Sequence, residues 1–365
     1  MHSHSYYMQR CLELAQLGAG HVAPNPMVGA VLVHEGKIIG EGWHRKYGEA
    51  HAEVNAIEDA EKRLAAHSGL AHKISQSTLY VSLEPCAHFG KTPPCVDLII
   101  QHKIPNVVIA CRDPFEQVNG KGIEKLKAAG VEVELGILEK EAVELNKRFF
   151  TFHEQQRPYI ILKWATTADG FIAPPPPAGG IQDSYSKRLL ISNEYTNRLV
   201  HKWRSEEAGI MIGTNTALLD DPSLTVRSWT GQSPVRLVLD RNLRLPASLK
   251  VFNKEVRTVV FNTLKQQEED NLLYYHLKKE ESLLPQLLKA LYELKIQSVL
   301  VEGGAQLLQS LIDGGCWDEA RIIRNDQLRI GKGLRGPQLT DAILKQETTI
   351  ATDTLRIFYH QKNEV

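Results

Sequence analysis

Apolar runs and amphipathic stretches alternate along the N-terminal part of the chain. Residues 27–44 predict two strands that turn at Glu35–Gly36, because apolar stretches flank a short polar turn. Residues 51–67 carry apolar side chains at helical spacing, and residues 7–20 predict a helix that ends at two glycines. Further strands are expected at 77–85, 106–114 and 131–137, and further helices at 95–104 and 122–130. This alternation predicts a layered α/β sheet.

A second series of predicted strands follows Pro158. The alternation breaks in the stretch "NKRFFTFHEQQRP", so we place a domain boundary between Asn146 and Pro158. Strands are expected at 159–170, 208–216, 235–241, 258–262, 298–304 and 319–326. Helical stretches lie between several of them, which again indicates an α/β fold. We therefore predict one domain at 1–148 and a second at 157–365.

Two segments of the second domain lack a regular apolar pattern. Four consecutive prolines at 174–177 predict a loop, because proline cannot donate to the hydrogen-bond ladder of a central strand. The polar stretch 264–282 predicts a solvated helix or loop, and we assign it no function.

Composition and charge narrow the class of protein. The 365 residues exceed one typical core, and 42% hydrophobic with 24% charged residues is ordinary for globular domains. Lysine plus arginine equals aspartate plus glutamate at 43 each, with no basic stripe, which favours a small-molecule partner over nucleic acid. The pattern predicts no membrane span and no secretory signal. Five cysteines do not suggest a disulfide framework, so we expect a reducing, cytoplasmic compartment.

A histidine, a glutamate and two cysteines form the most informative constellation. His51 and Glu53 are followed by Cys86 and Cys95. A catalytic zinc takes three nitrogen or sulfur ligands and leaves a position for water, and His51, Cys86 and Cys95 are ligands of this type. Zinc lowers the pKa of such a water, and Glu53 is placed to move its proton. The order of H-x-E and later P-C is typical of zinc deaminases, whose glutamate is not a ligand.

The spacing of the two cysteines departs from that pattern. Eight residues separate them, where two are usual, and Thr92 with the two prolines after it predicts a helix that starts near Cys95. His88 lies in the same loop and is an alternative ligand that would make the zinc structural. The alternative for the whole set is a capping histidine beside two buried thiols.

Long stretches of the chain resemble the bifunctional riboflavin-biosynthesis deaminase/reductase family. Three stretches resemble the family's deaminase half: "APNPMVGAVLV", "GWHRKYGEAHAEVNAI" and "LEPCAHFGKTPPCVDLI". Three others resemble its reductase half: "VHKWRSEEAGIMIGTNTALLDDPSLTVR", "PVRLVLDRNLRLP" and "VEGGAQLLQSLIDGGCWDEARI". The resemblance implies a cytidine-deaminase-like αβα domain followed by a dihydrofolate-reductase-like α/β domain. It also implies two reactions, the hydrolytic deamination of a diamino-pyrimidinone that carries a phosphoribosylamino group and the reduction of its ribosyl group to ribityl. The implied cofactors are one Zn²⁺ in each deaminase domain and NADPH, and the implied assembly is a homo-oligomer, dimer or tetramer, formed through the reductase domain.

The same resemblance implies further site residues. The implied substrate contacts are Asn25, His44, Lys91 and Asp113 in the first domain, and Arg204, Leu224, Arg227 and Glu302 in the second. The implied cofactor contacts are Lys163, Thr166, Asp169, Thr216, Asp220, Gly303 and Gly304. The chain has Phe115 where the family usually has asparagine after "DP".

The chemistry of these residues agrees with such roles and also allows plainer ones. An amide pairs with a pyrimidine edge, and the forks of two arginines suit a phosphate. No G-x-G-x-x-G is present, but "VLVEGGAQLLQSL" predicts a strand, a Gly-Gly turn and a helix whose free N–H groups can hold phosphate. The plainer roles are a solvated Lys91, surface ion pairs of the arginines and an ordinary tight turn.

Two other hypotheses stay open from the sequence. In the second hypothesis the C-terminal domain has lost most of its catalysis and mainly binds a partner or builds an oligomer. Two features favour it: Leu190, where the family usually has a tryptophan, and the proline loop. Retention of Asp220, Arg227 and Glu302 favours the two-step enzyme. A nucleic-acid-editing deaminase is the third hypothesis, and the zero net charge argues against it.

Overall fold

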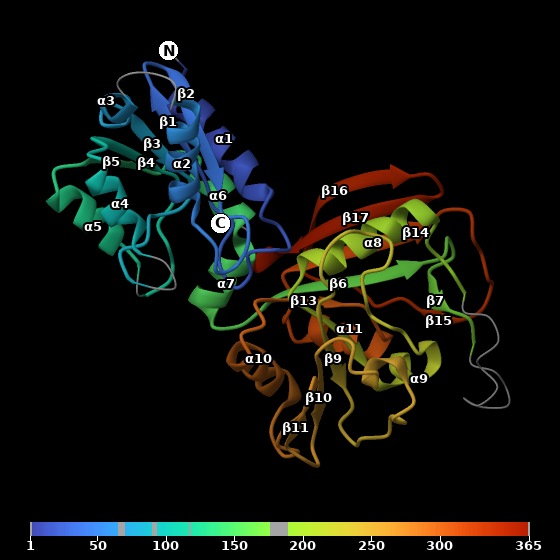
Figure 1. Ribbon diagram of the computed structural model, residues 1–365. Coiled ribbons are helices and arrows are strands. Elements are labelled where there is room, and N and C mark those ends of the chain that lie inside the picture. The colour runs from blue at the N-terminus through green and yellow to red at the C-terminus, as the bar shows by residue number, and fades with distance from the viewer. Residues whose placement is uncertain (1, 65–69, 90–92, 117, 176–188, 364–365) are drawn as a thin grey trace. The chain divides into compact units, whose positions relative to one another are not determined.

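The computed structural model describes residues 2–64, 70–89, 93–116, 118–175 and 189–363. The chain forms two compact units, Met1–Gln156 and Arg157–Val365, each built around its own sheet (Figure 1). Lys91, the prolines after Pro175 and residues 178–188 lie outside the described residues. Within the described ranges no helix is both long and apolar enough to cross a membrane.

Unit 1 contains a five-stranded sheet in the order β2-β1-β3-β4-β5. Its strands are β1 Gly29–His34, β2 Lys37–Trp43, β3 Thr78–Val81, β4 Asn106–Ile109 and β5 Glu132–Leu135. β1 is antiparallel to β2 and β3, whereas β3, β4 and β5 are parallel. β3 and β4 are buried over most of their length and consist mainly of apolar residues, whereas β5 at the edge is largely exposed and carries Glu132 and Glu134.

Helices cover both faces of this sheet. They are α1 His4–Gln16, α2 Ala52–Leu64, α3 Leu70–Ile74, α4 Cys95–Gln101, α5 Lys121–Ala128, α6 Glu139–Leu145 and α7 Lys147–Gln155. Ala30 and Leu32 of β1 pack with α2, α4 and α5, whereas Val31 and Val33 pack with α1, α6 and α7. The alternation of side chains along a strand thus divides one sheet between two cores, giving the αβα layers that the sequence predicted.

Unit 2 contains a ten-stranded sheet in the order β11-β12-β10-β9-β8-β13-β6-β14-β17-β16. Its strands are β6 Tyr159–Thr166, β8 Gly209–Gly213, β9 Val235–Leu239, β10 Thr258–Asn262, β11 Gln267–Glu269, β12 Leu272–His276, β13 Ser298–Val301, β14 Glu319–Asn325, β16 Ala342–Ile350 and β17 Asp353–His360. The strands from β12 to β14 are parallel, and the outer pairs at both edges are antiparallel. A separate pair joins β7 Phe171–Ala173 to β15 Leu334–Arg335.

The helices of unit 2 lie on opposite faces of its sheet. They are α8 Glu194–Glu206, α9 Thr214–Asp220, α10 Leu283–Glu293 and α11 Ala305–Asp313, with short 3-10 turns η2 Lys250–Phe252 and η3 Gln361–Asn363. Ile160 and Leu162 of β6 pack with α10 and α11, whereas Ile161 packs with Trp203 of α8. The carboxyl ends of the parallel strands lie on the same side of this sheet, where side chains from several elements meet.

The structure confirms the helices and strands predicted for unit 1, although the first helix begins and ends earlier than predicted, at His4 and Gln16, and α3, α6 and α7 were not predicted. The prediction for 264–282 was wrong, because this polar stretch contains β11 and β12. Leu272 and Leu273 are buried against β10, and that pairing, which the local pattern does not reveal, makes the segment a strand.

Candidate active sites

Three metal-binding side chains of unit 1 converge from distant parts of the sequence. Nδ1 of His51 lies 3.6 Å from Sγ of Cys86 and 3.3 Å from Sγ of Cys95, and all three ligand atoms lie within 4.8 Å of one another. A tetrahedral zinc with bonds of about 2.1 Å to nitrogen and about 2.3 Å to sulfur holds such atoms about 3.6 Å apart. The donor set and its spacing therefore fit zinc. His88 is not part of this cluster.

The two thiols of this cluster have pKa values shifted in opposite directions. Hydrogen bonding with Cys95, and next with His51, holds the pKa of Cys86 well below its usual range despite burial. The same hydrogen bond, with burial, raises the pKa of Cys95. Cys95 is the first residue of α4, as the prolines before it predicted, and its backbone N–H donates to Sγ of Cys86 at 3.4 Å. One thiolate, the form that binds metals, is therefore already favoured.

Glu53 is buried in the first turn of α2, only 3% exposed. Burial raises its pKa to about 7. The helix is held against β2 so closely that a Cβ on Gly42 would lie 2.3 Å from the backbone nitrogen of Ala56. His51 caps this helix, since its carbonyl accepts from Asn55 at 3.1 Å. The capping role and the metal-facing ring are thus compatible, and the helix carries Glu53 to the cluster.

Asn25 and His44 form a pair beside His51. Nδ1 of His44 lies 3.1 Å from the carbonyl oxygen of Ala50, so this nitrogen carries the proton. Nε2 of His44 then accepts from the Asn25 amide at 3.2 Å. Burial lowers the pKa of His44, and its ring centroid lies 5.3 Å from that of His51. A neutral imidazole and an oriented amide therefore stand next to the metal cluster.

Asp113 lies in the loop after β4 and is 7% exposed. Burial raises its pKa to about 7, and the nearby charges of Glu84 and Cys86 add to the rise. Its Oδ1 accepts from the backbone N–H of Phe115 at 2.8 Å. Six predicted residues of the deaminase site, together with Asp113, thus lie in or near one cluster.

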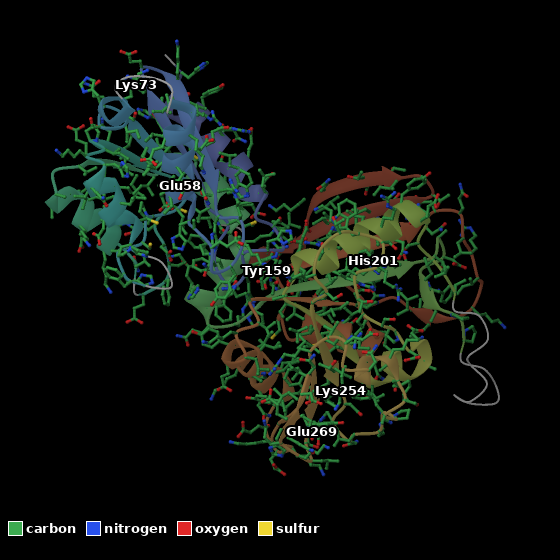
Figure 2. All side chains as sticks on the ribbon, viewed as in Figure 1. Glu58, Lys73, Tyr159, His201, Lys254 and Glu269 are labelled. Carbon is green, nitrogen blue, oxygen red and sulfur yellow. The ribbon has the colours of Figure 1, made fainter. Side chains whose placement is uncertain are left out.

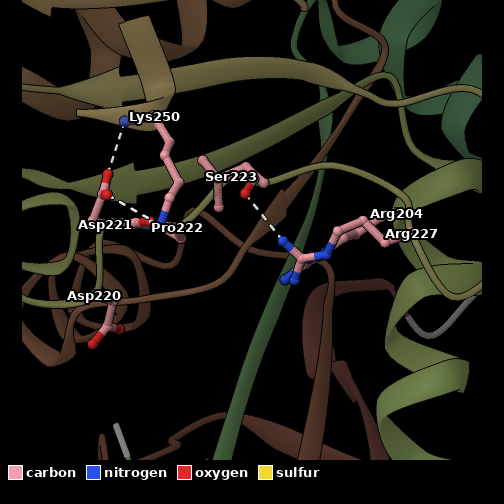
Figure 3. A pocket seen from close by; sticks show the side chains of 8 residues that line it. Arg204, Asp220, Asp221, Pro222, Ser223, Arg227 and Lys250 are labelled. Carbon is pink, nitrogen blue, oxygen red and sulfur yellow. Dashed lines mark hydrogen bonds and ion pairs between the residues drawn. The ribbon is translucent and has the colours of Figure 1, made fainter. Parts of the chain in front are cut away.

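Unit 2 contains a pocket of about 250 Å³, shown in Figure 3. It is lined by Arg204, Asp220, Asp221, Pro222, Ser223, Leu224, Arg227 and Lys250. Four of these residues, Arg204, Asp220, Leu224 and Arg227, were predicted site residues. Three cationic side chains lie around this pocket together with Asp220 and Asp221, and the guanidinium of Arg227 suits an anionic group such as a phosphate.

Arg204 and Glu302 form a buried ion pair behind this pocket. Nε and a terminal nitrogen of Arg204 donate to the two carboxylate oxygens of Glu302 at 2.7 and 2.8 Å. Nζ of Lys163 lies 3.8 Å from the same carboxylate. Burial alone would raise the pKa of Glu302, but Arg204 and Lys163 outweigh it and lower the pKa to about 2. The Arg204 fork is therefore engaged by a carboxylate, whereas the guanidinium of Arg227 donates a hydrogen bond to Ser223.

His201 supports the Arg227 segment from α8. Its Nδ1 accepts the backbone N–H of Arg227 at 3.1 Å, and the side chain is 2% exposed. Burial, followed by the charges of Arg204 and Arg227, lowers its pKa to about 4. His201, labelled in Figure 2, is thus a neutral acceptor that holds the pocket wall.

The predicted cofactor residues fall into two groups. Side chains added at Gly303 or Gly304 would meet Oγ1 of Thr216 at 3.4 or 3.1 Å, so the Gly-Gly turn lies against α9. Asp169 instead accepts from the backbone N–H of Ile330 and of Gly331 at 3.1 and 2.8 Å. Thr166, at the end of β6, lies 3.2 Å from a Cβ added at Gly336. The printed contacts of Asp169 and Thr166 therefore connect them to the 328–336 loop and not to the lining of the pocket.

Sequence reasoning missed several residues of both sites. Ser223 lies between the predicted residues Asp220 and Leu224, and no sequence motif marks it. Its hydroxyl oxygen accepts a hydrogen bond from Arg227 at 3.0 Å. Lys250 enters the pocket from η2, where its Nζ lies 3.1 Å from a carboxylate oxygen of Asp221. No local signal marks Lys250, because only the fold brings η2 to the pocket. In unit 1, Glu84 was not predicted as a site residue, although a glutamate shortly after a buried strand is a recognisable local feature.

Two families match the two halves of the chain. Residues 1–111 match the cytidine and deoxycytidylate deaminase zinc-binding region. Residues 158–342 match the RibD C-terminal domain.

Full-length relatives show the same pairing. The chain is 40% identical to riboflavin biosynthesis protein RibD of Aquifex aeolicus over 97% of both chains. It is 34% identical to the protein of that name from Escherichia coli, over 91% of this chain and 89% of that one. Its fold is similar to the crystal structure of a diaminohydroxyphosphoribosylaminopyrimidine deaminase/5-amino-6-(5-phosphoribosylamino)uracil reductase from Thermotoga maritima, with 35% identity, 98% coverage of both chains and a TM-score of 0.82. Acinetobacter baumannii RibD gives 31% identity at the same coverage and TM-score.

Proposed function

The chain belongs to the RibD family of riboflavin-biosynthesis proteins, and on this basis we propose which of its residues carry the two reactions. It is a bifunctional enzyme with a zinc-binding deaminase domain and a reductase domain that uses NADPH. We propose as its substrate the diaminohydroxyphosphoribosylaminopyrimidine for which the Thermotoga protein is named. We propose 1–148 as the extent of the deaminase and 157–365 as that of the reductase.

His51, Cys86 and Cys95 are the proposed zinc ligands, because their ligand atoms already have tetrahedral spacing. When bound, zinc supplies a Lewis acid that makes water a nucleophile near neutral pH. Glu53 takes a proton from the attacking water and delivers it to the departing amine. The buried position of Glu53 on α2, outside the ligand cluster, supports this role.

Four residues are proposed to recognise the pyrimidine and its substituents. Asn25 presents an amide that is fixed by Nε2 of His44, so it meets the ring with one orientation. Asp113 is a buried carboxyl group whose raised pKa allows it to donate as well as accept a hydrogen bond. Lys91 is retained as a phosphate contact from the family resemblance alone.

The reductase site is proposed around the pocket in unit 2. NADPH supplies the hydride, and the protein positions the sugar and neutralises phosphate. Arg227 and Leu224 line the pocket for the phosphorylated sugar, and Arg204, which also lines it, is held by Glu302. The proposed NADPH contacts are Lys163, Thr166, Asp169, Thr216, Asp220, Gly303 and Gly304.

The convergence of His51, Cys86 and Cys95 beside buried Glu53 is the observation that carries the proposal. The test measures zinc content, ammonia release and NADPH oxidation with the diamino-pyrimidine substrate for the wild type and Glu53→Gln. Glu58→Gln is the matched control, since Glu58 lies on the same helix and is exposed (labelled in Figure 2). We expect Glu53→Gln to keep about one zinc per chain and to lose both activities.

The outcome of the same test separates the two domains. When the deaminated intermediate is supplied, Glu53→Gln should oxidise NADPH as fast as the wild type. Ammonia release that survives in Glu53→Gln contradicts the proton-transfer role. Failure of the wild type to oxidise NADPH with that intermediate would revive a C-terminal domain that only binds or assembles, a reading that the full-length relatives do not favour.

We propose a homo-oligomer, dimer or tetramer, from the family resemblance, and a small-molecule partner in place of nucleic acid. We propose a cytoplasmic location because all five cysteines are free thiols. Sedimentation of the purified chain tests the first of these proposals.

A further inference from the structure

Glu84 is a buried carboxylate that the proposed chemistry does not use. It lies two residues before Cys86 and is 4% exposed. Four backbone N–H groups donate to it. Oε2 accepts from Asp113 at 3.3 Å and Gly120 at 3.0 Å, and Oε1 accepts from Gly122 at 2.9 Å and Ile123 at 3.2 Å. These donors satisfy a buried charge that would otherwise be strongly unfavourable.

All four donors belong to one segment, the loop 113–120 and the first turn of α5. Glu84 fastens this loop at its start and at its end. Its own backbone N–H donates to the carbonyl of Cys111 at 3.0 Å, which adds a third connection to the end of β4. Asp113 and Gly120, at the two ends of this loop, are thus held by one side chain.

This segment lies very close to Glu84 and Pro85, the two residues before Cys86. A Cβ on Gly122 would lie 2.1 Å from the carbonyl oxygen of Pro85 and 3.1 Å from Oε1 of Glu84. Only glycine permits this approach. The segment is therefore packed directly on the two residues that precede Cys86, and the loop cannot shift without losing contact with Glu84.

We infer that Glu84 is a positioning residue of the deaminase, which sets the place of Asp113 relative to the zinc ligand Cys86. The inference rests on the proposed function of unit 1. Asp113 depends on Glu84 through its own backbone N–H, and its side chain then accepts from Phe115. Glu84 thereby fixes a substrate-facing group without touching the substrate.

The perturbation is Glu84→Gln, which keeps the size of the side chain but provides one acceptor oxygen where two served four donors. Glu84→Asp keeps the charge and shortens the reach. Leu12→Ala is the control for general loss of stability, since Leu12 is a buried residue of α1 and belongs to a different core from Ile123 of the fastened segment. All variants are prepared as the full chain with zinc bound.

Two readouts are combined. Hydrogen–deuterium exchange at Asp113, Gly120, Gly122 and Ile123 reports whether the loop has been released, and it does not depend on activity. Steady-state deamination reports KM and kcat. We expect Glu84→Gln to speed exchange at these amides and to raise KM for the pyrimidine about tenfold or more, with kcat within about threefold and zinc content unchanged. Glu84→Asp should recover part of the change in KM, and Leu12→Ala should leave KM as in the wild type.

Three results would overturn the inference. Exchange at the four amides that is unchanged in Glu84→Gln shows that the side chain does not hold the loop. Faster exchange with an unchanged KM shows a purely structural role. A wild type that binds zinc but releases no ammonia refutes the proposed function of unit 1, and the inference falls with it; this case is recognised by the wild type alone.

Discussion

The ion pair between Arg204 and Glu302 gives the sharpest prediction, because both partners are buried. Their side chains are 10% and 8% exposed, so removing one charge leaves the other without compensation. The pKa of Glu302 falls from its ordinary value of 4.5 to about 2. At about 1.4 kcal/mol for each tenfold change in proton affinity, this corresponds to roughly 3 kcal/mol of folding free energy. We therefore expect Glu302→Gln to destabilise unit 2 by about 3 kcal/mol at pH 7, within the range of about 3–5 kcal/mol typical of broken buried pairs.

The pH dependence has a definite sign. Because the folded pKa of Glu302 lies below its ordinary value, its stabilisation is complete above about pH 4.5 and is lost as the pH falls through about 2. The difference between wild type and Glu302→Gln should therefore shrink to about 1 kcal/mol at pH 3.

Urea denaturation followed by tryptophan fluorescence measures this difference. Of the tryptophans, Trp43 lies in unit 1, and Trp164, Trp203, Trp229 and Trp317 lie in unit 2, so the signal reports mainly the reductase unit. With a slope of about 2.5 kcal/mol per molar urea, the midpoint should fall by about 1 M at pH 7.

Two further variants decide whether the reasoning holds. Glu281→Gln removes an exposed ion pair with Lys278 and should change stability by less than about 0.5 kcal/mol. The double variant Arg204→Met with Glu302→Gln should be less destabilised than the sum of the single variants, because neither charge is then left unpaired. Equal midpoints for wild type and Glu302→Gln at pH 7, or a difference that does not shrink at pH 3, would refute the reasoning.

Three other predictions concern the two sites. Cys95→Ser should lower zinc content and abolish ammonia release while NADPH oxidation with supplied intermediate continues, and retained zinc with full activity would contradict the assignment of this ligand. Gly42→Val should reduce ammonia release at least about tenfold, because the valine side chain would displace α2 and Glu53 with it. Thermal unfolding followed by circular dichroism should show a lower stability of this variant. Arg227→Lys should raise KM for the phosphorylated intermediate about tenfold with kcat nearly unchanged, because lysine lacks the guanidinium fork that contacts Ser223 and faces the pocket. A KM equal to that of the wild type would place the phosphate elsewhere.

Much of the fold and part of each site were predictable from the sequence. The apolar runs Ala30–Val33 and 159–162 mark strands wherever they pair. The zinc ligands were predictable because His51 with Glu53 and Pro85 with Cys86 are short motifs whose chemistry depends on local order. The prediction for 264–282 failed because β12 owes its form to β10, which precedes it and covers Leu272 and Leu273.

The sequence indicated two α/β series with most of their central strands, the donor atoms for zinc and the residue types around the pocket proposed for phosphate, but not α6, α7, β11, β12, β16 or β17. Only the tertiary structure decided which groups meet. It engaged the Arg204 fork with Glu302, brought Lys250 to the pocket and gathered four backbone N–H groups on Glu84. Local patterns record the period of a helix or strand and the chemistry of a short motif. The partners of a side chain depend on how distant elements pack, and no local pattern contains that information.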